Sequence, residues 1–170
     1  MFLGRTDVVS SSDAFDSLVG AIDYPMFIVT ASHDDQRAGC LVGFATQASI
    51  DPARMMVMIS KKNHTYSIAS RADRLVIHFL GAGNFELAKL FGEETGDEVD
   101  KFSRCAWTPT ADGLPVLHGT LGWVACRVLD RFDAGDHVGH LVEPIYGETT
   151  GETRQLGFQA VVSLQPGHAA

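Results

Sequence analysis

The sequence has little that would hold a fold together covalently or anchor it in a membrane. It contains three cysteines, and Cys40, Cys105 and Cys126 are far apart and form no C-x-x-C pair. Such spacing is typical of free thiols in a reducing compartment. No apolar run approaches the roughly 18 residues that a membrane span requires, and the N-terminus has no apolar signal region. We therefore expect a cytoplasmic protein without a membrane partner.

Positive charge is scarce as well. The 13 Lys and Arg residues are outnumbered by 21 Asp and Glu residues, which gives a formal net charge of −8. General binding of nucleic acid requires basic patches, so we expect no nucleic-acid partner. A length of 170 residues, with 45% hydrophobic and 20% charged side chains, predicts one globular domain over residues 1–170.

The hydrophobic pattern predicts a mainly β protein, of the α+β class, with a few short helices. Apolar residues recur at helical spacing from Phe15 to Ile22, after Ser12 as a candidate N-cap. Two more short helices are expected at 63–72 and 84–92. Strands are expected at 26–31, 40–49, 54–60, 74–80, 120–132, 137–148 and 153–167. Because short glycine-containing turns join them, these strands favour an antiparallel meander or Greek-key barrel.

One window of this acidic chain contains no acidic residue. Residues 52–72 lack Asp and Glu but include the pair Lys61 and Lys62, at the junction of an expected strand and helix. Free N–H groups and the positive helix end can bind an anion there, with hydroxyls from Ser60 and Thr65. Because side chains alternate along a strand, only one of the two lysines would face that anion. The alternative is that the lysines protect a strand end from pairing, and spacing alone does not choose.

Two other patterns look functional but lack the required context. The stretch Gly81–Glu86, "GAGNFE", resembles a dinucleotide-binding loop, yet Glu86 replaces the third glycine and would repel a pyrophosphate. We interpret it as the turn that begins a helix. His137 and His140 lie three residues apart, which on a strand places them on opposite faces, and no third ligand is obvious. We therefore expect no metal site.

Three segments together resemble the flavin reductase-like family, which has the FMN-binding split-barrel fold. They are "AGCLVGFATQASIDP" at 38–52, "SKKNHT" at 60–65 and "LDRFDAGDHVGHLVEPI" at 129–145. Thr46–Ser49 fall on the family's T-S-V-S pattern, and Gly135–His137 fall on its G-D-H turn. The likeness extends over roughly residues 24–145 and includes "DKF" at 100–102.

The resemblance implies an antiparallel Greek-key split β-barrel with short flanking helices, and a homodimer that holds FMN, or alternatively FAD, across its interface. It implies a flavin-proximal histidine at His137, whose alternative role is to cap the hairpin turn with Asp136. It also implies a set of cofactor-binding residues. These are Thr46, Gln47, Ala48, Ser49, Ser60, Lys61, Lys62, Asn63, Thr65 and Phe102.

The activity implied is that of an NAD(P)H-dependent flavin oxidoreductase, in which hydride passes from a nicotinamide to flavin N5. The reduced flavin would then serve a monooxygenase or another electron acceptor. An alternative is a non-catalytic FMN-binding electron carrier or flavin store, and a third is a barrel that binds another ligand, such as haem or a deazaflavin.

The sequence departs from the family pattern in two places. Leu41 and Gly43 stand where many relatives carry Thr and Ser or Asn, which removes side-chain hydrogen bonds to the flavin. The C-terminal segment lacks a tyrosine found near the nicotinamide in some relatives, and Phe158 or His168 could serve instead.

Overall fold

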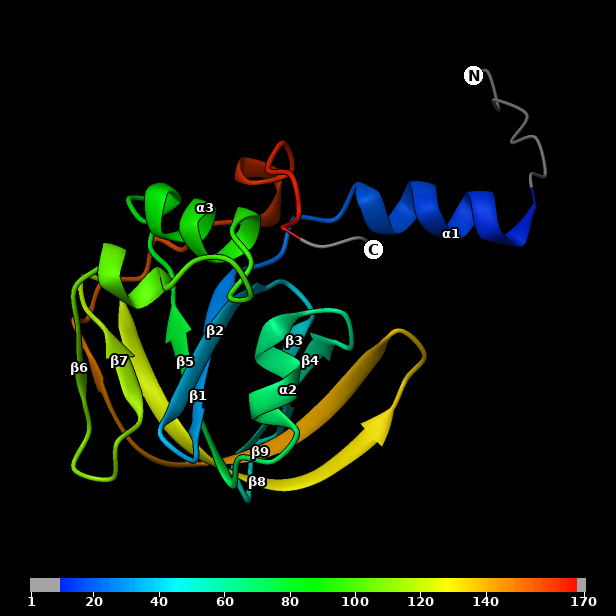
Figure 1. Ribbon diagram of the computed structural model, residues 1–170. Coiled ribbons are helices and arrows are strands. Elements are labelled where there is room, and N and C mark those ends of the chain that lie inside the picture. The colour runs from blue at the N-terminus through cyan, green and yellow to red at the C-terminus, as the bar shows by residue number, and fades with distance from the viewer. Residues whose placement is uncertain (1–9, 168–170) are drawn as a thin grey trace.

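The structure is a computed structural model that describes residues 10–167. Within that range it contains three α-helices, nine strands and two short 3-10 helices (Figure 1). The helices are α1 (Ser11–Gly20), α2 (His64–Ala69), α3 (Phe85–Glu93), η1 (Lys101–Arg104) and η2 (Phe158–Ala160). The strands are β1 (Phe27–His33), β2 (Gln36–Val42), β3 (Ala45–Ser49), β4 (Arg54–Ser60), β5 (Arg74–Phe79), β6 (Trp107–Pro109), β7 (Pro115–Leu117), β8 (Gly122–Asp133) and β9 (His137–Thr149).

Seven of the strands form one antiparallel sheet in the order β2-β1-β5-β8-β9-β4-β3. Strands β6 and β7 form a separate two-stranded sheet. The hairpin of β8 and β9 is the longest pairing, and its tip extends beyond the neighbouring strands (Figure 1). The predicted fold class, a mainly antiparallel β protein with a few short helices, is confirmed.

The predicted strand 40–49 is two strands that lie at opposite edges of the sheet. Only Gly43 and Phe44 join β2 to β3, so the two edges must come together there and the sheet must curve round. The Phe44 carbonyl accepts a hydrogen bond of 2.9 Å from the Met58 N–H of β4. Within residues 10–167 no ladder joins β2 directly to β3.

The core fills the inside of this curved sheet. The concave faces of β1, β2, β4 and β5 contribute small and branched side chains, and Ile68 and Ala69 of α2 pack onto them. A second apolar cluster lies between β1, α3 and the C-terminal segment, around Phe91 and Leu156. These two clusters fix β2 and β4, which line the site described below.

Two expected elements differ from the structure. Residues 153–167 do not form a strand. They make single bridges, Pro25 with Gly157 and Gly81 with Gln155, and then the turn η2. The N-cap of α1 is Ser10 rather than Ser12, because the Ser10 hydroxyl accepts from the Asp13 N–H at 3.2 Å.

Helix α1 projects from the body of the molecule (Figure 1), and none of its residues is buried. The helices at 63–72 and 84–92 form close to where they were expected, and Asn63 is the N-cap of α2. None of the helices in residues 10–167 is long and apolar enough to cross a membrane.

Candidate functional site

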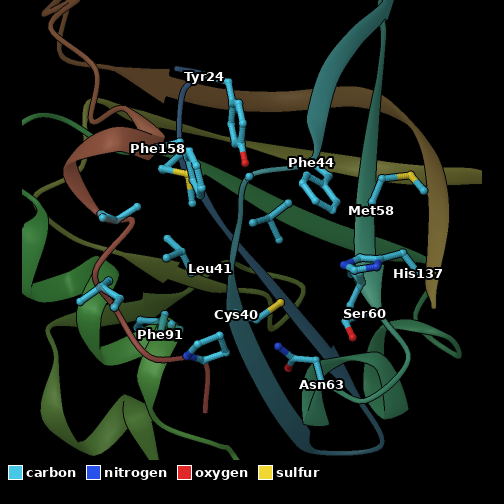
Figure 2. A pocket seen from close by; sticks show the side chains of 18 of the residues that line it. Tyr24, Cys40, Leu41, Phe44, Met58, Ser60, Asn63, Phe91, His137 and Phe158 are labelled. Carbon is cyan, nitrogen blue, oxygen red and sulfur yellow. The ribbon is translucent and has the colours of Figure 1, made fainter. Parts of the chain in front are cut away.

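A pocket of about 420 Å³ opens between β2 and β4 (Figure 2). Its floor is formed by Cys40 to Phe44 at the end of β2, and its opposite side by Met58 and Ser60 of β4. The end of α1 and the C-terminal segment close the remaining sides. This volume falls within the range of roughly 300–1,000 Å³ that is usual for cofactor pockets.

One wall of the pocket is aromatic and firmly held. Tyr24 and Phe158 stack with ring centroids 4.7 Å apart and an interplanar angle of 13°. The Phe158 N–H donates to the Tyr24 carbonyl at 2.8 Å, and the Gln159 N–H donates to Asp23 Oδ1 at 3.0 Å. These bonds tie the C-terminal segment to the chain that follows α1, so the wall is a fixed surface.

The facing side of the pocket carries His137. It pairs directly with Ser60 in the β4–β9 ladder, and its ring centroid lies 5.2 Å from that of Phe44. Its Nδ1 lies 2.8 Å from Asp136 Oδ1, and this hydrogen bond lowers the pKa of the Asp136 carboxyl. The carboxylate therefore orients the imidazole and leaves Nε2 as the nitrogen available to a ligand.

The loop that begins with Ser60 lies at the edge of the pocket, and most of its polar groups have partners. Lys61 Nζ donates to Asp133 Oδ2 at 2.6 Å, which lowers the pKa of Asp133. The Lys62 N–H donates to Ser60 Oγ at 3.3 Å. Asn63 lines the pocket, and its side chain accepts from the Thr65 N–H at 2.9 Å. An anion at this loop would therefore compete with existing contacts.

Thr65 points away from that loop. Its side chain is buried and hydrogen-bonded to the Cys40 thiol, whose pKa is raised by burial to about 11. Thr65 thus belongs to the packing between α2 and β2, and it does not line the pocket.

The other predicted cofactor residues lie outside the pocket lining. Thr46, Gln47 and Ala48 are exposed on the edge strand β3, with Ser49 half-buried at its end. Phe102 is buried and packs edge-on against Phe91 and Trp107. Of the predicted set, Ser60, Asn63 and His137 meet in the pocket.

A comparison with known protein families identifies the family of the chain that forms this pocket. The family model described as "Flavin reductase like domain" matches residues 19–159. The chain belongs to the flavin reductase-like family. The match includes all nine strands and the helices α2 and α3, and it includes the pocket lining except Val161, Leu164 and Pro166.

Two curated relatives show how this domain occurs in other proteins. The "Probable flavin reductase" of Rhizobium meliloti is 30% identical over 130 residues, which cover 74% of this chain and 39% of that protein. "Diflavin flavoprotein A 1" of Synechocystis is 27% identical over 123 residues, covering 72% of this chain and 22% of that protein. The flavin reductase-like chain therefore spans only about a fifth to two fifths of these relatives.

A solved structure similar in fold is the NADH:FAD oxidoreductase of Streptomyces globisporus. It superposes with a TM-score of 0.78 at 19% identity, over 90% of this chain and 91% of that one. At this identity the likeness concerns the fold.

Sequence reasoning missed the aromatic side of the flavin reductase-like pocket. Tyr24 and Phe44 line it, although neither was a candidate. A Cβ on Gly43 would lie 2.6 Å from Tyr24 Cε2. The ring of Tyr24 therefore occupies the space that a side chain at position 43 would need. No signal in the sequence pairs residue 24 with residue 43. Phe158 does line the pocket, and His168 lies outside the described residues.

His140 is oriented away from His137, as the strand alternation predicts. It is 0% exposed, and burial together with the nearby Arg131 lowers its pKa to about 4. His140 is therefore part of the core, and its substitution would disturb the packing of the sheet.

Proposed function

We propose that this chain is an NAD(P)H-dependent flavin reductase that works as one domain in the cytoplasm, and that the pocket between β2 and β4 holds the isoalloxazine ring of FMN or FAD. The observation that carries this proposal is the pocket itself. It combines an apolar floor, a stacked aromatic wall and an oriented histidine inside a flavin reductase-like domain. Flat apolar surfaces with few convergent polar groups suit a planar heteroaromatic ring.

Each side of the pocket has a separate task in this proposal. Phe44, Leu41 and Met58 exclude water from the ring. Ser60, Asn63 and one of the two lysines would face the phosphate side, and the polar side chains of Thr46, Gln47 and Ser49, which lie outside the pocket lining, would meet the ring edge from β3. The hydride chemistry is supplied by flavin and nicotinamide, so the protein's contribution is to stack and shield them. Reduced flavin would then pass to a monooxygenase or another acceptor.

The experiment that tests this function is direct. The purified protein is loaded with FMN or FAD and mixed without oxygen with NADH or NADPH, and loss of the oxidised flavin absorption is followed. We expect rapid loss with at least one nicotinamide.

The match to about a fifth of a diflavin flavoprotein favours a second candidate, an electron-transfer module. That candidate binds flavin but accepts electrons from a protein donor and not from NAD(P)H.

His137 is predicted to assist reduction of the flavin. General acid–base help is worth about 10²–10⁴-fold. Hydride transfer needs no obligatory proton donor, so we expect His137→Ala to slow single-turnover reduction by roughly tenfold to a hundredfold, the low end of that range or below it. Affinity for FMN should change much less, because the imidazole adds one contact among many. His118→Ala, at an exposed histidine outside the pocket, is the control. Equal reduction rates for the two variants would show that His137 only shapes the turn.

A homodimer is part of the proposal, and the exposed apolar side chains of α1 are the observation that supports it. The helix exposes Phe15 (65%) and Leu18 (70%), with Ile22 (52%) just beyond it. An isolated helix of 10 residues is marginal in water. The C-terminal end of α1 lines the pocket and the charged residues of the helix are acidic, whereas Lys61 and Lys62 lie in the chain between the lining residues Ser60 and Asn63. We propose that α1 packs against the pocket rim of a second copy.

This arrangement predicts a change in oligomeric state. Leu18→Glu should convert a dimer into a monomer in light scattering coupled to size exclusion, because it places a charge in an apolar contact. Ile50→Glu, at an apolar side chain that is 84% exposed and lies outside α1, should leave the dimer intact. A wild-type protein that is monomeric at all concentrations would contradict the dimer.

A further inference from the structure

The hydroxyl of Tyr24 is a polar group in the pocket without a protein partner. In residues 10–167 the structure shows no hydrogen bond to this oxygen, and burial raises the pKa of Tyr24. Figure 2 shows the phenol directed into the pocket, with its oxygen between Phe158 and Phe44. Tyr24 is half-buried and its O–H lies at the open side of the pocket, so it can donate to a ligand that enters the pocket without breaking a contact within the protein.

The position of the ring is imposed by its surroundings. Tyr24 stacks on Phe158 on one side and covers Gly43 on the other. A Cβ at position 43 would lie 2.6 Å from Tyr24 Cε2 and 3.3 Å from Met26 Sδ, so any side chain there would push the phenol aside. Gly43 thus gives Tyr24 its place at the junction of β2 and β3.

We propose that Tyr24 is a ligand-binding residue whose O–H donates a hydrogen bond to a carbonyl oxygen on the heteroaromatic ring bound in the pocket, and that Gly43 is the positioning residue that permits this. The inference rests on the proposed flavin reductase function. Two rings of that reaction carry a suitable oxygen: the flavin, on its pyrimidine carbonyls, and the nicotinamide, on its carboxamide. The phenol is not required to transfer a proton.

The test compares Tyr24→Phe with the wild type by titration with oxidised FMN and, separately, with NAD⁺ added to the FMN-loaded protein. Phe keeps the stacking on Phe158 and removes only the O–H. A flavin contact should weaken FMN binding by roughly two- to tenfold, the value of one neutral hydrogen bond, and shift the flavin absorption band. A nicotinamide contact should leave FMN binding unchanged and weaken NAD⁺ binding by the same factor.

Gly43→Ala provides a second, independent arm. It should weaken the same ligand as Tyr24→Phe, and the double variant should bind no more weakly than Gly43→Ala alone, because the contact is already lost. Tyr146→Phe, at a tyrosine outside the pocket, is the matched control.

The results separate this inference from the proposed function. If Tyr24→Phe binds both ligands within twofold of the wild type, the role of Tyr24 is refuted while flavin reduction stands. A wild-type protein that binds no flavin refutes both.

Discussion

Acidification from pH 6.5 to pH 4 should lower the free energy of unfolding by several kcal/mol, because two histidines are buried in the neutral form. Burial is the main cause that lowers the pKa of both His78 and His140 from 6.5 to about 4. Each folded-state pKa lies below the unfolded value, so the unfolded chain binds protons first. The stability is fully present above pH 6.5 and is lost as the pH falls towards 4. A shift of this size corresponds to roughly 3 kcal/mol for each histidine.

His78 shows why the neutral form is required. Its Nε2 accepts from the Leu117 N–H at 2.9 Å, and its Nδ1 lies 3.0 Å from the Ile28 carbonyl. The ring therefore joins β5 to β7 and β1, and a proton on Nε2 would break the first of these bonds. The carboxyl groups with lowered pKa values, such as Asp112 at about 2, titrate below the range from pH 6.5 to pH 4.

Chemical denaturation across this pH window measures the effect. His78→Gln should be less stable than the wild type at pH 6.5 and should lose about half of the acid dependence. His118→Gln, at an exposed histidine, should keep all of it. A wild-type unfolding free energy that stays flat between the two pH values would contradict the buried neutral state of both rings.

Loss of a phosphate contact at the Ser60 loop should weaken FMN binding by roughly ten- to a hundredfold, since a hydrogen bond to a charged group contributes about 1.5–3 kcal/mol. We expect this for Lys61→Ala or Lys62→Ala. Thr65, whose hydroxyl was predicted to bind the anion, is not a suitable position for this test, because its buried side chain packs against Cys40. Binding should also weaken with added salt, since part of the attraction comes from exposed charge.

The ion pair of Lys61 with Asp133 supplies a matched control. Asp133→Asn removes the competing carboxylate 2.6 Å from Lys61 Nζ, and it should leave FMN affinity unchanged or raise it. Riboflavin lacks the phosphate, so it should bind the wild type more weakly than FMN does and lose little more in the lysine variants. If riboflavin and FMN bind the wild type equally, no anion is held at this loop.

The sequence was informative wherever local pattern decides structure. Two β-rich segments on either side of a turn predicted the β8–β9 hairpin, and the helix expected to begin at or near Asn63 is α2, which begins at His64. The sequence predicts one strand over 40–49, because neither a proline nor a charged residue interrupts this stretch. Its division at Gly43 and Phe44 depends on the hydrogen bond to β4, which is far away in sequence.

The aromatic wall could not be predicted for the same reason. The sequence predicts a strand over 153–167, but the segment makes only the single bridges of Gln155 and Gly157 and then packs as the turn η2 against Tyr24. The family resemblance identified His137, Ser60 and Asn63, which meet in the pocket. It said nothing of Tyr24, whose place depends on the absence of a side chain at Gly43.

The central claim is that the pocket between β2 and β4 holds a flavin that NAD(P)H reduces. The most direct measurement is anaerobic stopped-flow mixing of FMN-loaded and FAD-loaded protein with NADH and with NADPH, alongside Tyr24→Phe and His137→Ala. The account predicts fast loss of the oxidised flavin absorption in the wild type, and slower loss in His137→Ala. A protein that binds flavin in this pocket but is reduced by neither nicotinamide faster than free flavin would contradict the reductase and leave an electron-transfer module.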